Sequence, residues 1–446
     1  LTYTLNTTNN PSGYTINSLD SFTGWNDNGR DNQNFLVSFR KVGSTSFGDT
    51  FPVCYTGSVM LTHVNVTNLS LAHVDAVRFT FLAQENGGVG YKELDLLGAP
   101  PLYTEVTSLD SGSKVIASND TASVFVTDGS GNRSPITLGT ASTAIDSLVQ
   151  GTTTGLTVID PAGQTLALNG LFLRPDAGIL AITNGTLLGL QSPLVVGNAS
   201  SNAVVLGAAI ANRAPAGFLL KTGPGTLTLA STNSSPGGTE VSGGTLRLVS
   251  GASLGSGYVN VHDGTLQLDG GLVNPATSNS MRLCFINATL NQTAGSLSYG
   301  GYLQAQNTAL NLSGGSSYLV ADALLGWGGT NTTATIGGTH SADWRTTRFS
   351  SGTVSLTLQS GGKLYTDRIY SSVGATGSVY FDGGTLAVSS QNPSLYSSDW
   401  LGVASGSLSL LVRDGGAVID TANGGVTIRR PFLRDGASAG GLTKTG

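Results

Sequence analysis

The sequence feature that most constrains the fold is a short motif, Gly-Thr-Leu-x-Leu, which recurs at a nearly constant interval. It begins at Gly225, Gly244 and Gly264, so successive copies start 19 and 20 residues apart. A fixed period near this length, with one short strand in each unit, is typical of a β-solenoid. A helical repeat is excluded, because glycine and β-branched residues dominate these segments and no helical periodicity is present.

The two leucines of each motif occupy alternate positions, so both face the same side of a strand. A single strand cannot bury them. When the equivalent strand of the next coil lies roughly 4.8 Å away, the leucines form a continuous ladder in the interior. Glycine pairs before the strands, at Gly243–Gly244 and Gly383–Gly384, predict the positive-φ corners of the coil. We expect six inward-facing leucines in these motifs: Leu227, Leu229, Leu246, Leu248, Leu266 and Leu268.

Composition and texture divide the chain into three regions. Glycine accounts for 63 of 446 residues, about twice its usual share, and charged residues for only 11%. Residues 1–100 hold most of the varied chemistry and end at Pro100-Pro101; residues 101–215 predict irregular solenoid coils; residues 216–446 contain the repeats. The expected fold class is all-β, an N-terminal β-sandwich (jelly roll) followed by a long parallel β-solenoid. At roughly 20 to 25 residues per coil, the solenoid would have on the order of 15 coils, with a right-handed turn.

The charge balance narrows the partners. The net charge is −5 and there is no basic run, which argues against nucleic acid. No apolar run approaches the length of a membrane span, and the first residues predict a strand instead of a signal peptide. The two cysteines, Cys54 and Cys284, are far apart in sequence, so we expect small buried side chains and neither a disulfide nor a metal site.

The densest polar cluster lies near the N-terminus, in the segment WNDNGRDN. An indole ring stacks well on a sugar ring, and amide, carboxylate and guanidinium groups bond to sugar hydroxyls. Asp27 and Asp31 also offer the oxygen ligands that Ca²⁺ prefers. An ordinary turn between strands explains the same residues. The candidate ligand-binding residues are Trp25, Asn26, Asp27, Arg30 and Asp31.

The segment from Gly217 to Leu248 resembles the autotransporter-associated β-strand repeat. It reads GFLLKTGPGTLTL, then an Asn/Ser/Gly-rich turn, then GGT and GGTLRL. The resemblance implies a passenger-like β-helix outside a bacterial cell. The closing GGLTKTG, Gly440 to Gly446, resembles the start of a second copy, cut off at 440–446. We therefore expect the natural polypeptide to continue beyond Gly446, or its open edge to be completed by another subunit.

The N-terminal region resembles a discoidin-like, galactose-binding-type jelly roll. Two segments support this resemblance, Ser21 to Gly43 and Val74 to Gly98, of which the second ends in GYKELDLLG. The opening strands of such a domain are not evident, so the domain would be truncated at its start. The resemblance implies a head that binds surface glycans.

A glycan-cleaving β-helix enzyme is a rival interpretation, because its carboxylates and basic groups would converge on one coil face. The candidates are Asp343, Arg345, Arg348, Asp367, Arg368 and Asp399, and they are equally explained as solvated loop residues. No nucleophile motif accompanies the four histidines, and a zinc site would need several of them in register. These histidines, which we expect to be structural, are His63, His73, His262 and His340.

The sequence as a whole predicts a non-enzymatic extracellular or cell-surface protein, structural or adhesive, without a cofactor. A self-assembling subunit of a filament, sheath or surface layer is the first alternative, with copies of the chain joined head-to-tail. The polysaccharide-cleaving enzyme is the second. Twelve N-x-S/T sequons allow glycosylation, although many such sequons arise by chance in a chain rich in Asn, Ser and Thr.

Overall fold

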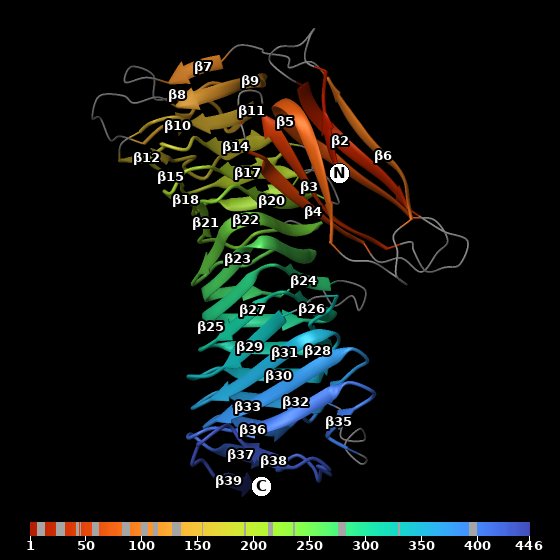
Figure 1. The fold of residues 1–446 in the computed structure, drawn as a ribbon. Helices are drawn as coiled ribbons and strands as arrows, with labels where there is room; N and C mark the ends of the chain where they lie inside the picture. The colour runs from red at the N-terminus through yellow and green to blue at the C-terminus, as the bar shows by residue number, and fades with distance from the viewer. Residues whose placement is uncertain are drawn as a thin grey trace. The chain divides into compact units, whose positions relative to one another are not determined.

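The computed structural model describes most of the chain, and every regular element in the described residues is a β-strand (Figure 1). It divides into two compact units, Leu1–Leu246 and Arg247–Gly446. The fold class is the predicted one: an N-terminal curled antiparallel sheet followed in the chain by a parallel β-solenoid of about 13 turns. The described ranges are 1–6, 14–23, 32–41, 44, 46–55, 62–82, 90–99, 106–109, 115–126, 135–153, 155–190, 193–212, 217–234, 237–274, 282–328, 331–391 and 399–446.

The N-terminal residues form one curled sheet with the strand order β4-β3-β5-β2-β6, and β1 pairs with β5. Its long central strand β5 pairs antiparallel with both β2 and β3. Phenylalanine, valine and leucine alternate along these strands, so one face is apolar; Phe35, Phe39 and Phe79 are almost completely buried there. The strands are β1 (Thr2–Thr4), β2 (Tyr14–Thr23), β3 (Gln33–Lys41), β4 (Gly48–Tyr55), β5 (Thr62–Phe81) and β6 (Tyr91–Ala99).

The coils of the first unit are built from short strands that pair in parallel with the equivalent strand one coil later. One column runs β11-β14-β17-β20-β22, a second β12-β15-β18-β21, and a third β13-β16-β19. The strands are β7 (Val106–Leu109), β8 (Val115–Ile116), β9 (Asn119–Val126), β10 (Thr137–Leu138), β11 (Ser142–Gln150), β12 (Leu156–Ile159), β13 (Thr165–Leu168), β14 (Gly170–Leu173), β15 (Ile179–Ile182), β16 (Thr186–Gly189), β17 (Leu194–Asn198), β18 (Val204–Leu206), β19 (Ala209–Asn212), β20 (Phe218–Thr222), β21 (Thr226–Leu229) and β22 (Gly238–Val249), which crosses the boundary between the units.

One outward face of these coils is apolar instead of polar. Val195 and Leu220 face away from the coil interior, yet they are buried in the same hydrophobic cluster as the phenylalanines of the N-terminal sheet. Phe172 and Phe218 pack against that cluster. The antiparallel sheet of the first unit therefore covers the side of its own parallel coils, and an outward aliphatic residue here is part of a core.

The second unit repeats the parallel arrangement. Its strands are β23 (Tyr258–Val273), β24 (Arg282–Ile286), β25 (Thr289–Tyr299), β26 (Tyr302–Gln306), β27 (Ala309–Leu312), β28 (Ser316–Leu325), β29 (Asn331–Ile336), β30 (Ser341–Phe349), β31 (Gly352–Gln359), β32 (Lys363–Ser371), β33 (Ala375–Asp382), β34 (Thr385–Val388), β35 (Leu401–Val403), β36 (Ser407–Val412), β37 (Ala417–Asp420), β38 (Phe432–Arg434) and β39 (Leu442–Thr445).

The leucine ladder is confirmed. All six predicted leucines have no exposed surface. Leu229 lies opposite Leu206 of the preceding coil, and Leu266 lies opposite Leu290 of the following one. The coils, however, are longer than the repeat suggests. Val196 pairs with Leu171, 25 residues earlier, and Ile419 pairs with Leu386, 33 residues earlier. Longer coils leave about 13 turns, fewer than the 15 expected.

The glycine corners agree with the prediction at three of the four positions. Gly243, Gly244 and Gly383 have φ values of 88°, 63° and 87°. Gly384 has no positive φ; a Cβ at this residue would lie 2.6 Å from the carbonyl oxygen of Gln359. Glycine is therefore required at Gly384 for close packing between coils and at the other three for backbone conformation.

Candidate functional site

The predicted ligand-binding residues of the N-terminal region lie outside the described residues. The structure does describe the base from which that segment leaves the sheet. Thr23 and Gln33, which flank it, are both buried, and Thr23 Oγ1 lies 2.6 Å from Thr62 Oγ1. The Gln33 side chain donates to the backbone oxygens of Ser21 and Thr62 at 3.1 and 3.2 Å. This polar network ties β2, β3 and β5 together directly beneath the candidate site.

A second polar cluster of the N-terminal sheet surrounds Asp20. Its Oδ1 lies 2.6 Å from Nε2 of His63 and accepts a 2.5 Å hydrogen bond from the amide of Asn65. The hydrogen bond from Asn65 is the main effect that lowers the pKa of Asp20, with His63 adding to it. The His63 ring stacks on Phe22 with centroids 4.3 Å apart. The imidazole is thus held by a strand neighbour and a carboxylate.

His340 is also bonded within the protein. Its Nδ1 lies 2.9 Å from the carbonyl oxygen of Gly314, and its Nε2 lies 3.0 Å from Ser317 Oγ. Ser317 Oγ also accepts a 2.9 Å hydrogen bond from the indole of Trp344. Burial lowers the pKa of His340. These contacts support the predicted structural role. The side chain of His73 lies outside the described part of the chain.

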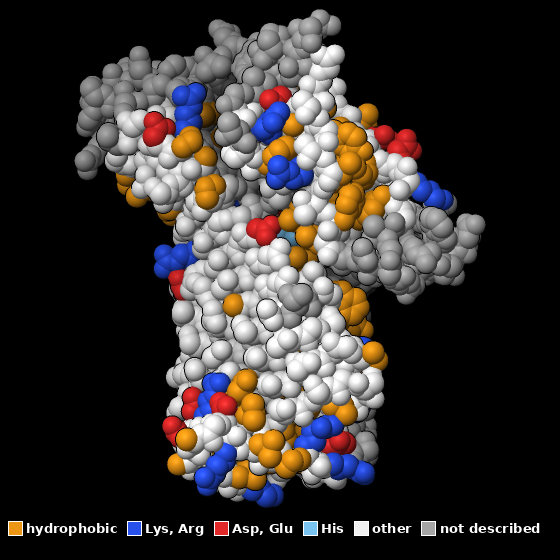
Figure 2. Space-filling model, in the orientation of Figure 1, with side chains coloured by type: hydrophobic (Ala, Val, Ile, Leu, Met, Phe, Trp, Pro, Cys, Tyr) orange, Lys and Arg blue, Asp and Glu red, His pale blue; other side chains and the backbone are white. Residues whose placement is uncertain are grey.

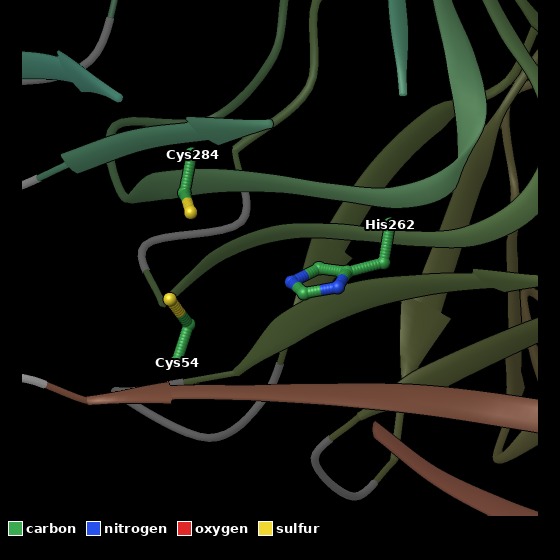
Figure 3. Close-up of side chains that lie close together, drawn as sticks. All are labelled: Cys54, His262 and Cys284. Carbon is green, nitrogen blue, oxygen red and sulfur yellow. The ribbon is translucent and has the colours of Figure 1, made fainter. Parts of the chain in front are cut away.

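His262 and Cys284 lie on adjacent paired strands of the second unit (Figure 3). Both are buried, and their ligand atoms lie within 4.8 Å of each other. Neither ring nitrogen of His262 has a hydrogen-bond partner among the described residues. Zinc sites take three or four protein ligands, so these two groups of one unit do not complete one. Cys54, also drawn in Figure 3, belongs to β4 of the first unit.

The structure separates the six residues considered for glycan cleavage. The guanidinium carbons of Arg348 and Arg368 lie 5.4 and 4.7 Å from the ring centre of Tyr370, so these two arginines do meet. Asp367 is fully buried, and Asp399 accepts from the backbone N–H of Arg429 at 3.4 Å.

Asp343 has other neighbours: its Oδ1 accepts from Ser389 Oγ at 2.8 Å and from the amide of Gln391 at 2.9 Å. Arg345 is exposed. Among the contacts described for these residues, no two carboxylates converge as acid and base catalysis of glycan hydrolysis would require.

The arrangement around Asp343 was not evident from the sequence, which marked only its carboxylate. Asp343 lies directly opposite Tyr318 on one side and Tyr365 on the other. All three side chains point outward, because they alternate with the buried Leu319, Trp344 and Leu364. The period-2 alternation around each tyrosine could have shown its orientation. The pairing of segments 22 and 25 residues apart could not be read from a motif.

Lys221, the lysine of the predicted repeat, points into the coil. It is fully buried and pairs with Val196 and Val241 of the two neighbouring coils. Its Nζ donates to the carbonyl oxygens of Thr222, Gly223 and Gly243 at 2.9, 2.7 and 3.2 Å. Burial lowers its pKa to about 7, whereas the three carbonyls favour the ammonium form. The side chain bonds one coil to the corner of the next.

Comparison with known proteins identifies this same region. Residues 219–248, from β20 to β22, match the family model Passenger-associated-transport-repeat. The repeat resemblance is therefore confirmed over nearly the predicted range, and the match does not extend to the N-terminal region. No curated protein and no solved structure matches the chain.

An all-β chain whose parallel coils include this repeat is an autotransporter-passenger-like β-solenoid. Such repeats are typical of passengers, which are secreted or exposed at the cell surface. In the described residues, no helix has the length and hydropathy to cross a membrane.

Proposed function

We propose that this protein is a structural and adhesive component of a bacterial cell surface. The observation on which this rests is the passenger-associated repeat at residues 219–248, folded as part of a parallel solenoid. In a solenoid the interior ladder sets the stability of each coil, and the outward side chains vary without disturbing it. Such a scaffold suits a long surface that displays binding residues.

The surface location is tested on intact cells of the source organism. Protease added outside the cells should remove the polypeptide, whereas a cytoplasmic marker protein stays intact. Antibodies raised against the second unit should label the same cells without permeabilisation. Polypeptide that becomes accessible to protease and antibody only after lysis would contradict the proposal.

The adhesive part of the proposal includes the N-terminal segment with Trp25 and Arg30. Its discoidin-like resemblance implies glycan binding, and the buried network of Gln33 gives the segment a firm base. Replacing Trp25 with Ala should reduce adhesion to glycan-coated surfaces at least tenfold, because the stacking platform is lost. Trp327→Ala, at a partly exposed tryptophan of the second unit, is the matched control and should leave this adhesion unchanged. Equal losses in both variants would remove the N-terminal segment from the proposal.

The proposal also states that the protein acts without catalysis. Its support is that Asp343 and Asp399 contact different groups and Asp367 is buried. Incubation with pectin, alginate and other polysaccharides should release no new reducing or unsaturated ends. Turnover that disappears in Asp367→Ala or Asp343→Asn would show that the protein is an enzyme.

A further inference from the structure

The outward face of the second unit places two tyrosines and a carboxylate in one line. Tyr318 on β28, Asp343 on β30 and Tyr365 on β32 are consecutive partners in a parallel ladder. Neighbouring strands lie roughly 4.8 Å apart, so the two tyrosines are separated along the coil axis by about 10 Å. Tyr318 is 42% exposed, and Tyr365 and Asp343 are partly exposed. We call these three residues the tyrosine strip.

We propose that the tyrosine strip binds a neutral polysaccharide chain that lies along the coil axis. The spacing of the two rings approximates the length of a disaccharide, so alternate sugar rings would meet a tyrosine. Aromatic rings supply apolar contact area to the C–H faces of sugars, and nearby polar groups fix the orientation. The strip has both kinds of group on one rigid sheet, which lowers the ordering cost of binding.

The polar groups of the strip are held in place by neighbours. The Asp343 carboxylate is oriented by Ser389 and Gln391, and the Gln391 amide also lies 3.4 Å from the backbone oxygens of Leu319 and Asp343. A carboxylate between the two rings accepts hydrogen bonds from sugar hydroxyls. The same negative charge would repel a uronic acid or a sulfated sugar, which is why we infer a neutral chain.

Lys363 completes the surroundings. Its ammonium lies 4.6 Å from the ring centre of Tyr365 and 2.9 Å from Asp420, so its charge is already paired and does not create an anion site. On the face seen in Figure 2, charged and hydrophobic side chains are interspersed toward β32–β39 of the second unit, whereas the coils near β27–β29 show mainly uncharged polar groups. The strip lies on strands β28 to β32, between these two surroundings.

The inference concerns the purified chain and therefore fails or succeeds separately from the surface location proposed above. The test is affinity electrophoresis of the full chain in gels that contain hydroxyethyl cellulose, xylan or dextran, with alginate as the anionic comparison. Retardation is expected with at least one of the neutral polymers and none with alginate. Tyr318→Ala and Tyr365→Ala should each weaken binding at least tenfold.

The matched control is Tyr302→Ala on β26, because Tyr302 is 40% exposed and lies outside the strip. Its affinity should stay within twofold of the unmodified protein. Asp343→Asn keeps a hydrogen-bond acceptor and removes the charge, so it should lose less affinity than the tyrosine variants. Thermal unfolding of each variant checks folding. Retardation by none of the neutral polymers, preference for alginate, or an equal loss in Tyr302→Ala would overturn the proposal.

Discussion

The ammonium group of Lys221 lies 3.2 Å from the carbonyl oxygen of Gly243, so a lysine inside one coil is bonded to the corner of the next. Lys444 of the closing GGLTKTG makes the same local contact, since its Nζ lies 2.7 Å from the carbonyl oxygen of Gly446, just as Lys221 Nζ lies 2.7 Å from that of Gly223. The repeat motif thus specifies a lysine that bonds to the corner of its own coil, and at Lys221 this contact is extended to the following coil.

Lys221→Met should destabilise the protein by about 2 kcal/mol, because hydrogen bonds to a charged group are lost while the methylene packing is largely kept. Chemical denaturation followed by far-ultraviolet circular dichroism measures the loss. Lys92→Met, at an exposed lysine of β6, is the control and should change stability by less than about 0.5 kcal/mol. Equal stability of Lys221→Met and the unmodified protein would show that the three carbonyl contacts merely offset the cost of burying the ammonium.

The pH dependence of this lysine has a definite sign. Burial lowers the pKa of Lys221 from its ordinary 10.5 to about 7, so the unfolded chain binds the proton more tightly than the folded one. Between these values the unfolded state carries more protons, and the contribution of Lys221 to stability rises with pH.

The measurement is the free energy of unfolding at several pH values from 6 to 10 for the unmodified protein and for Lys221→Met. The difference between the two should grow above about pH 7 and stay constant below it. A difference that is flat up to pH 10 would show that the carbonyls of Thr222, Gly223 and Gly243 keep the ammonium form in the folded state.

Leu246→Ala should cost roughly 2–5 kcal/mol, because the side chain is fully buried in the leucine ladder and its removal leaves a cavity. Leu156→Ala makes the same chemical change at a leucine that is 52% exposed in the first unit, and it should cost much less. Denaturant midpoints of the two variants give the comparison. Similar costs at the two positions would mean that burial in the ladder does not determine the loss.

Gly244→Ala should destabilise the protein by more than about 1 kcal/mol, because φ is positive at this residue and a Cβ would meet backbone oxygens. The built Cβ lies 2.4 Å from the carbonyl oxygen of Gly225. Gly251→Ala separates the two effects, since Gly251 also has a positive φ but no atom within 4 Å of the added Cβ. It should therefore cost less than Gly244→Ala, and the reverse order would contradict the role of close packing at the corner.

Much of the fold was determined by the sequence alone. Leucine at alternate positions, repeated at a short interval, leaves a strand no way to bury its apolar side except against a copy of itself. The parallel ladder at Leu229 and Leu266 follows from that constraint. The glycine corners at Gly243 and Gly244 follow from the need for positive φ, and the passenger-like repeat was recognisable from its residues.

Other features were decided only by the tertiary structure. The length of each coil depends on the loops between strands, which carry no periodic signal, so the register that places Asp343 between Tyr318 and Tyr365 could not be read from spacing. The same holds for Val195 and Leu220, which face outward but are buried under the N-terminal sheet. Local patterns determine which side of a strand a residue faces, because side chains alternate. What covers that side depends on residues distant in the sequence, and only their packing reveals it.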